Sequence, residues 1–282
     1  MGNFQVVYKE SGYRRRQWNN AHGICISFPC SGRNWLQNII NDPVHGVDHP
    51  NKAVYFTHDL LNDDDQMTLT YKHIMGMNDT PSGHLWRQTY NNRSVVLLTR
   101  DPRDVVVSYY YQKKFREPFL VKKLIIAEEE AGNFDGTLDE FARHDIMGIR
   151  PQVEFLNTWS GELKNGVLRV RYEDMHSDIE KVVRKVLGHV GMEFEDEKMR
   201  RAIERASFEN IRKAESRAYN MKIRINNQDV GVMKGGIPQD ARKYRKGKMG
   251  EYKKELKPET IDYINNCISE HLDPAYEDYI NV

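Results

Sequence analysis

The fold of this chain is decided by one stretch, Ile24-Cys25-Ile26-Ser27-Phe28-Pro29-Cys30-Ser31-Gly32-Arg33-Asn34-Trp35-Leu36. Its apolar beginning predicts a short buried strand, and the residues after Gly32 predict an amphipathic helix. Pro29 and Gly32 predict a tight loop between the two. A loop at such a junction directs several backbone N–H groups and the positive end of a helix dipole at one point. We therefore expect this stretch to bind a phosphate or sulfate group.

Around this stretch the chain is long and undivided. No linker or low-complexity tract rich in Pro, Gly or Ser interrupts the 282 residues, so we expect a single domain over residues 1–282 with a sizeable core. Residues 1–20 are interpreted as an N-terminal extension. Residues 220–250 combine little periodicity with many charges, which predicts a long loop that covers a binding site as a lid.

The composition excludes several classes of protein. The 42 basic and 41 acidic residues nearly cancel, with basic clusters only at Arg14–Arg16 and Arg242–Lys248, so nucleic-acid binding is not expected. Three cysteines cannot form a paired framework, which favours a reducing compartment. No apolar run reaches membrane-spanning length, and the first residues lack the apolar segment of a secretory leader. We expect a cytoplasmic protein without a membrane span.

Strand-like and helical segments alternate along the chain. Apolar runs predict strands at Gly23–Phe28, Ala53–Thr57, Ser94–Thr99 and Gly166–Arg171. Helical periodicity predicts helices after Gly32 and Pro102 and at Pro118–Ala131, Leu138–His144, Pro151–Leu163, Ile179–Val190, Glu195–Ala206 and Pro258–Leu272. This order predicts an α/β fold, with a central parallel sheet flanked by helices and right-handed crossovers.

A second motif follows the third predicted strand, at Arg100-Asp101-Pro102-Arg103-Asp104-Val105-Val106-Val107-Ser108-Tyr109-Tyr110. Asp101 can cap the helix that Pro102 opens. Arg100 then lies at the carboxyl edge of the sheet, where open α/β sheets bind ligands. Ser108 follows about two helical turns later. An arginine suits an anion at this edge, because its planar fork matches phosphate oxygens and stays charged.

The two motifs together resemble those of PAPS-dependent sulfotransferases, where PAPS is 3′-phosphoadenylyl sulfate. The first loop resembles the family's 5′-phosphosulfate loop, Y/F-P-K-S-G-T-T-W-L, whereas the usual nucleotide loop G-x-x-x-x-G-K-[ST] is absent. The second resembles the 3′-phosphate motif R-x-P-R-D-x-x-x-S-x-Y. A third match, Arg245-Lys246-Gly247, resembles the R-K-G of the loop that folds over the nucleotide. The resemblance implies the P-loop-like sulfotransferase fold, with PAPS as donor and 3′-phosphoadenosine 5′-phosphate (PAP) as product.

The resemblance also assigns donor-binding residues. At the 5′ end it implies Cys30, Ser31, Gly32, Arg33, Asn34 and Trp35. At the 3′-phosphate it implies Arg100, Ser108, Arg245, Lys246 and Gly247. Val170–Met175 resembles a strand-ending Y-E-D-M and Ala206–Asn210 resembles T/A-S-F-x-x-M, which place Tyr172, Ser207 and Phe208 at the purine. An aromatic face against a base is physically reasonable, because stacking tolerates any purine orientation.

The general base is predicted at the end of the second strand. His58 stands where cytosolic sulfotransferases carry a K-T/S-H, although Phe56 replaces the lysine of that triplet. An imidazole titrates near neutral pH and can take the proton of the acceptor. Carbohydrate sulfotransferases often use a glutamate instead, so a carboxylate such as the adjacent Asp59 stays open as the alternative.

One substitution changes the chemistry of the first loop. Cys30 stands where the family has the lysine that stabilises charge on the bridging oxygen as the S–O bond breaks. Loss of one such preorganised cation costs about 10²–10³ in rate if nothing replaces it. Arg33 can reach back at helical spacing, so our hypothesis is that Arg33 acts catalytically by supplying this charge.

The sequence therefore predicts transfer of a sulfuryl group from PAPS to a hydroxyl or amine, without a metal. The acceptor is unknown and expected to be polar, a small molecule or a carbohydrate. One alternative is a catalytically weak relative that acts as a nucleotide-binding module, which Cys30 favours. Another is a P-loop kinase, which would need a loop lysine and magnesium-binding groups that this chain does not show in place. The oligomeric state stays open.

Overall fold

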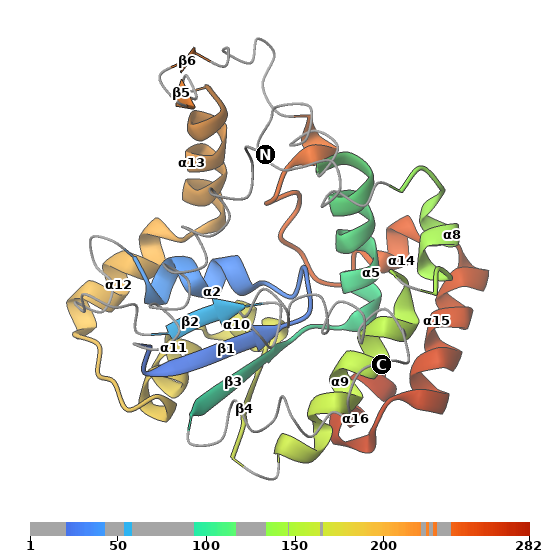
Figure 1. Ribbon diagram of the computed structural model, residues 1–282, viewed down its shortest axis with the longest axis horizontal. Helices are drawn as coiled ribbons and strands as arrows, with labels where there is room; N and C mark the ends of the chain where they lie inside the picture. The colour runs from blue at the N-terminus through green and yellow to red at the C-terminus, as the bar shows by residue number, and fades with distance from the viewer. Residues whose placement is uncertain are drawn as a thin grey trace, which may run out of the picture.

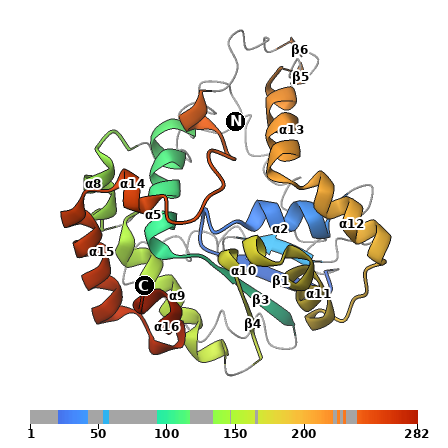
Figure 2. The same ribbon diagram turned by 180° about the vertical axis from the view of Figure 1, so that it is seen from behind.

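The computed structural model describes residues 21–42, 54–57, 93–116, 134–145, 147–163, 166–220, 224–225, 228–229 and 238–282. Figure 1 shows a central sheet with helices on both faces, and Figure 2 shows the same arrangement from behind. The predicted extension at 1–20, the predicted helix Pro118–Ala131 and His58 all lie outside the described residues.

The sheet consists of four parallel strands. They are β1 (Gly23–Ser27), β2 (Val54–Thr57), β3 (Ser94–Thr99) and β4 (Leu168–Arg171), in the order β2-β1-β3-β4. Every neighbouring pair in this sheet runs in the same direction, so all four carboxyl ends meet at one edge. The predicted parallel α/β sheet is confirmed, with β4 beginning two residues later than expected.

Side chains alternate between two cores, one on each face of the sheet. On β1, Ile24 and Ile26 face one core, whereas Cys25 faces the other. The first core is completed by α5 (Pro102–Tyr111), α9 (Ile149–Leu163), α15 (Pro258–His271) and α16 (Glu277–Ile280). The second is completed by α2 (Arg33–Ile40), α10 (Tyr172–Ser177), α11 (Ile179–His189) and α12 (Asp196–Arg205). Burial on both faces explains why the strands are continuously apolar.

The remaining described elements lie around this body. They are the π-helical turn η1 (Gln112–Arg116), α8 (Leu138–Ala142), α13 (Phe208–Asn220), β5 (Arg224–Ile225), β6 (Gln228–Asp229), η2 (Gln239–Ala241), α14 (Tyr252–Glu255) and η3 (Pro274–Tyr276). In Figure 1, α13 extends away from the sheet and carries the β5–β6 pair at its far end. No helix in the described part of the chain has the length and hydropathy needed to cross a membrane.

Most predicted helices are confirmed to within two residues at each end, as α8, α9, α11, α12 and α15. In the described part of the chain, four α-helices were not predicted: α10, α13, α14 and α16. The first is only six residues long, too short for periodicity to show. Within the predicted long loop at 220–250, the described part contains the antiparallel pair β5–β6 and the turn η2, which were not predicted. Strands of two residues cannot display an alternating pattern.

Candidate functional site

The loop between β1 and α2 has the shape that an anion site requires. Cys30 and Gly32 have positive φ angles of 67° and 95°, and the turn is closed by Ser31 N–H donating to Phe28 O at 3.3 Å. Gly32 is the N-cap of α2, and no side chain caps this end of the helix. The positive end of the α2 dipole is therefore presented toward the loop.

Gly32 is also required by a close neighbour. A Cβ at this position would lie 2.3 Å from Cδ2 of Tyr172, the first residue of α10. Tyr172 in turn lies beneath Arg100, whose Cζ is 4.4 Å from the ring centroid. One aromatic ring thus contacts both predicted anion-binding motifs.

We predict that Gly32→Ala destabilises the protein by about 1–3 kcal/mol, because it combines left-handed backbone strain with the clash against Tyr172. Chemical denaturation measures the change. Gly166→Ala is a matched control, since Gly166 has the same φ of 95° but nothing within 4 Å of its Cβ position. Equal losses in the two variants would show that contact with Tyr172 contributes nothing.

Arg100 occupies the carboxyl edge of the sheet between several partners. Its Nη1 donates to Cys30 O and to Ser108 Oγ, each at 3.2 Å, and its Nη2 donates to Lys248 O at 3.2 Å. Asp104 lies 3.7 Å from the same guanidinium. Asp101 caps α5 by accepting from Arg103 N–H at 2.9 Å, as predicted. The loop and the Arg100 motif, distant in sequence, therefore meet directly.

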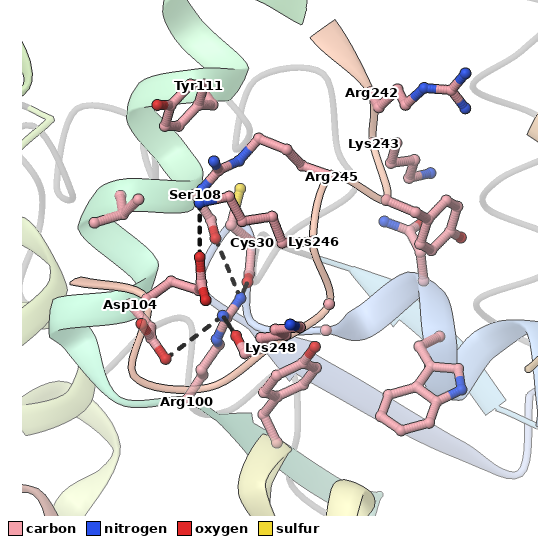
Figure 3. A pocket seen from close by; sticks show the side chains of 18 of the residues that line it. Cys30, Arg100, Asp104, Ser108, Tyr111, Arg242, Lys243, Arg245, Lys246 and Lys248 are labelled. Carbon is pink, nitrogen blue, oxygen red and sulfur yellow. Dashed lines mark hydrogen bonds and ion pairs between the residues drawn. The ribbon is translucent and has the colours of Figure 1, made fainter. Parts of the chain in front are cut away.

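Both motifs line one cavity of about 510 Å³, drawn in Figure 3. Its lining is strongly basic, with two acidic side chains, Asp104 and Glu251, against seven basic ones, Arg100, Arg116, Arg242, Lys243, Arg245, Lys246 and Lys248. The chain as a whole has a formal net charge of only +1. A concentration of positive charge in one cavity raises the local concentration of anionic ligands.

Residues 238–250, which we name the C-terminal strap, close one side of this cavity. Asp104 holds the end of the strap by accepting from Gly250 N–H at 2.7 Å and from Tyr252 N–H at 3.2 Å. Figure 3 shows the strap running past the side chains of α5. A single buried carboxylate therefore connects α5, Arg100 and the strap.

Two basic residues of the strap are already paired within the protein. Arg245 Nη1 donates to Glu255 Oε1 at 2.7 Å and its guanidinium stacks 3.7 Å from the Tyr111 ring centroid. Lys246 Nζ lies 2.7 Å from Glu251 Oε2. Burial raises the pKa of the Glu255 carboxyl, but hydrogen bonds from Lys246, Arg245 and Tyr111 outweigh it and lower this pKa to about 2. Glu255 is therefore ionised at neutral pH.

Aromatic residues line another part of the cavity. The Trp35 and Tyr172 ring centroids lie 6.0 Å apart, and Phe208 is 37% exposed although it is large and apolar. Burial, together with the positive charge of Arg100, lowers the pKa of His176, whose ring lies 4.7 Å from that of Tyr172. These rings provide apolar faces against which a base can stack.

The structure brings together most of the predicted site residues. Those that line the cavity are Cys30, Gly32, Asn34, Trp35, Arg100, Ser108, Tyr172, Phe208, Arg245, Lys246 and Gly247. Ser31, Arg33 and Ser207 are not among the lining residues. Ser31 is buried, and Ser207 Oγ instead accepts from Asn210 N–H at 3.4 Å at the start of α13. Their roles toward a ligand, like those of His58 and Asp59, stay predictions.

The sequence interpretation missed several lining residues, notably Asp104, Tyr111, Gln112, Arg116 and Lys243. Asp104 was visible as part of the second motif and Lys243 as part of the basic cluster Arg242–Lys248, whereas Tyr111, Gln112 and Arg116 carried no signal of their own. Among the described residues, no three His, Cys, Asp or Glu side chains form a metal-binding group. The expectation of a metal-free reaction stays a prediction.

Comparisons with known proteins agree with this geometry. The family model described as a sulfotransferase domain matches residues 21–274. Sulfotransferase 1E1 of Bos taurus is 27% identical over 188 residues, covering 66% of this chain and 54% of the relative. Flavonol 3-sulfotransferase of Flaveria bidentis is 29% identical over 186 residues, covering 64% and 55%. The chain spans about half the length of these curated relatives.

A solved structure shows the same fold. Mouse sulfotransferase SULT7A1 complexed with PAP has a TM-score of 0.54 and 16% sequence identity, and the likeness covers 88% of this chain and 82% of that one. The predicted P-loop-like sulfotransferase fold is thereby confirmed.

Proposed function

The chain belongs to the sulfotransferase domain family, and from this premise we propose that it transfers a sulfuryl group from PAPS to a hydroxyl or amine of a small-molecule or carbohydrate acceptor. The observation that carries the proposal is the meeting of the first loop and Arg100 at one basic cavity. PAPS carries anionic groups at its 5′ and 3′ ends, and two anion-binding motifs that share a cavity fit such a molecule.

The residues present also fit the donor in detail. Arg100 Nε is buried and has no hydrogen-bond partner among the described residues, which leaves a donor for a phosphate oxygen. We assign the 3′-phosphate to Arg100 and Ser108, with Arg245, Lys246 and Gly247 of the strap beside it. The exposed ring of Phe208 and the rings of Tyr172 and Trp35 are assigned to the purine.

The reaction forms one bond to sulfur and breaks another. The acceptor oxygen or nitrogen attacks sulfur while the S–O bond to the 5′-phosphate breaks, and that bonding electron pair stays on PAP. The acceptor proton passes to a base, which we assign to His58, with a carboxylate such as Asp59 as the alternative. As in phosphoryl transfer, the protein positions the reactants and neutralises developing charge. We place this activity in the cytoplasm, because the three cysteines Cys25, Cys30 and Cys267 form no disulfide, which favours a reducing compartment.

The test of this proposal begins with nucleotide binding. We expect PAP to bind in calorimetry at micromolar concentration, as substrates of enzymes commonly do, and to bind more tightly than ATP. Labelled PAPS is then offered with phenols, flavonols, sugars and amines, and labelled product is expected with at least one class. Failure of PAP to bind at millimolar concentration would refute the proposal, and tighter binding of ATP would favour a kinase.

A second candidate function is nucleotide binding without efficient turnover. It is favoured by Cys30, whose Sγ donates to Gln112 Oε1 at 3.1 Å and which provides no positive charge for the bridging oxygen. Both candidates require PAP binding, so transfer of label is the measurement that separates them.

A further inference from the structure

The charge that Cys30 lacks has a candidate source within the cavity. This inference rests on the proposed function, and it concerns the group that neutralises the 5′-phosphosulfate end of the donor. Arg33, expected from sequence to do so, does not line the cavity. Of the strap cations near the 3′ end, Arg245 and Lys246 are paired with Glu255 and Glu251.

Lys243 lies in the part of the strap that is hydrogen-bonded to α2 and α13. Its own N–H donates to Glu215 Oε1 of α13 at 2.7 Å. The next residue, Tyr244, accepts at its hydroxyl from Asn38 Nδ2 of α2 at 3.0 Å. Arg242 Nη1 donates to Ser216 Oγ at 3.0 Å. The backbone that carries Lys243 is thus held against the helix that begins at the first loop.

Lys243 belongs to the lining of the shared cavity. It lines this cavity together with Cys30, Asn34 and Arg116, and Figure 3 shows it across the cavity from Cys30. Part of the residue remains accessible to solvent. Within the described part of the chain, no hydrogen bond or ion pair engages its ammonium group, in contrast to Lys246.

The electrostatic surroundings of Lys243 are those of an anion site. The pKa of Lys243 is lowered to about 8, first by burial within the cavity walls and then by the positive charges of Arg116 and Arg33. Glu215 and Cys30 raise this pKa, but each has a smaller effect. Cations held close together with so little compensation favour an anion between them.

We propose that Lys243, with Arg116 beside it, binds the 5′-phosphosulfate of the donor and stabilises the bridging oxygen as its bond to sulfur breaks. The loop and helix dipole then contact the 5′ group from one side and the strap ammonium contacts it from the other. In this chain the strap would then supply the positive charge that the loop lysine supplies in the family.

The test is a series of ligands that differ only at the 5′ end: adenosine 3′-phosphate, PAP and PAPS. Lys243→Gln is expected to weaken PAP and PAPS about 10- to 100-fold, as for loss of a hydrogen bond to a charged group. Its affinity for adenosine 3′-phosphate is expected to stay within about twofold of wild type, because that ligand lacks the 5′ group. Lys185→Gln, at an exposed lysine of α11, is the control and should bind all three ligands normally.

The outcomes separate this inference from the proposed function. If wild type does not bind PAP, the proposed function fails. The inference fails if wild type binds PAP and Lys243→Gln binds PAP and PAPS as tightly as wild type does. It also fails if Lys243→Gln loses affinity for all three ligands to the same extent. Arg33→Ala, tested on the same series, decides directly between Arg33 and Lys243 as the source of the charge.

A second measurement begins with the wild-type protein and follows its affinity for PAP as a function of pH. A bound anion favours protonated Lys243, so the complex holds more protons than the free protein, and affinity for PAP falls as pH rises through about 8. Above that pH the decline approaches about tenfold per unit. Lys243→Arg, which stays charged, is expected to bind PAP tightly without this decline. Persistence of the decline in Lys243→Arg would assign it to another group, such as Cys30, and overturn the inference.

Discussion

Arg100→Gln is expected to lower the affinity for PAP by about 100-fold or more, because truncation of a buried, hydrogen-bonded charge costs about 2–5 kcal/mol. The guanidinium donates to Cys30 O, Ser108 Oγ and Lys248 O, so its loss removes a phosphate ligand and also the group that joins the loop, α5 and the strap. Calorimetry with PAP measures the effect.

The controls for this variant separate charge from shape. Arg100→Lys keeps the positive charge but loses the fork that contacts several oxygens at once, so we expect an intermediate affinity. Circular dichroism and thermal unfolding check that each variant is folded, since Asp104 loses its nearest positive charge. PAP binding by folded Arg100→Gln at wild-type strength would contradict the assignment of the 3′-phosphate.

Asp104→Ala is expected to lower the free energy of unfolding by about 3–5 kcal/mol, the usual cost of breaking a buried ionic pair by removing one partner. The side chain is only 2% exposed. Its removal leaves Arg100 without its carboxylate and leaves Gly250 N–H and Tyr252 N–H without their acceptor. Urea denaturation measures the loss, and faster proteolysis within residues 238–250 reports release of the strap.

An exposed acid provides the comparison for Asp104. Asp196 pairs with Arg184 at 2.7 Å, but its side chain is 68% exposed, so Asp196→Ala is expected to change stability by no more than about 1 kcal/mol. Asp104→Asn, which keeps one acceptor oxygen, should fall between the two. Equal stability of Asp104→Ala and Asp196→Ala would show that the strap is held by other contacts.

The strands and part of the site could be predicted from the sequence, because there the local sequence pattern favours the same structure as the tertiary packing. The strands could be predicted because both faces of the sheet are buried, which leaves continuous apolar runs such as Ser94–Thr99. Arg100 and Ser108 could be predicted because a strand end, a capping aspartate and a first-turn proline fix where the helix begins. Their meeting with the first loop follows from parallel strands that end at one edge.

Other features of the fold and the site could not be predicted from the sequence, because they depend on packing between segments that are distant in the chain. Helix α13 is polar along most of its length, and among those of its residues whose burial is described, only Ile211 lies in the core. Arg33 was expected at the cavity from the resemblance of the first loop and from helical spacing, but neither fixes the direction in which a long side chain points. Lys243 reaches the cavity only because Asn38 and Glu215 hold the strap in place.

The order in which the site is assembled has a consequence for biosynthesis. The first loop and Arg100 are synthesised before Lys243, Gly250 and Glu255, which follow Arg100 by about 140 residues or more. Translation proceeds at about 5–20 residues per second, so the first loop and Arg100 are synthesised some seconds before the strap. A nascent chain that has not yet reached the strap therefore has the loop but not the cations and hydrogen bonds of the strap, and high-affinity capture of the nucleotide must await synthesis of the strap.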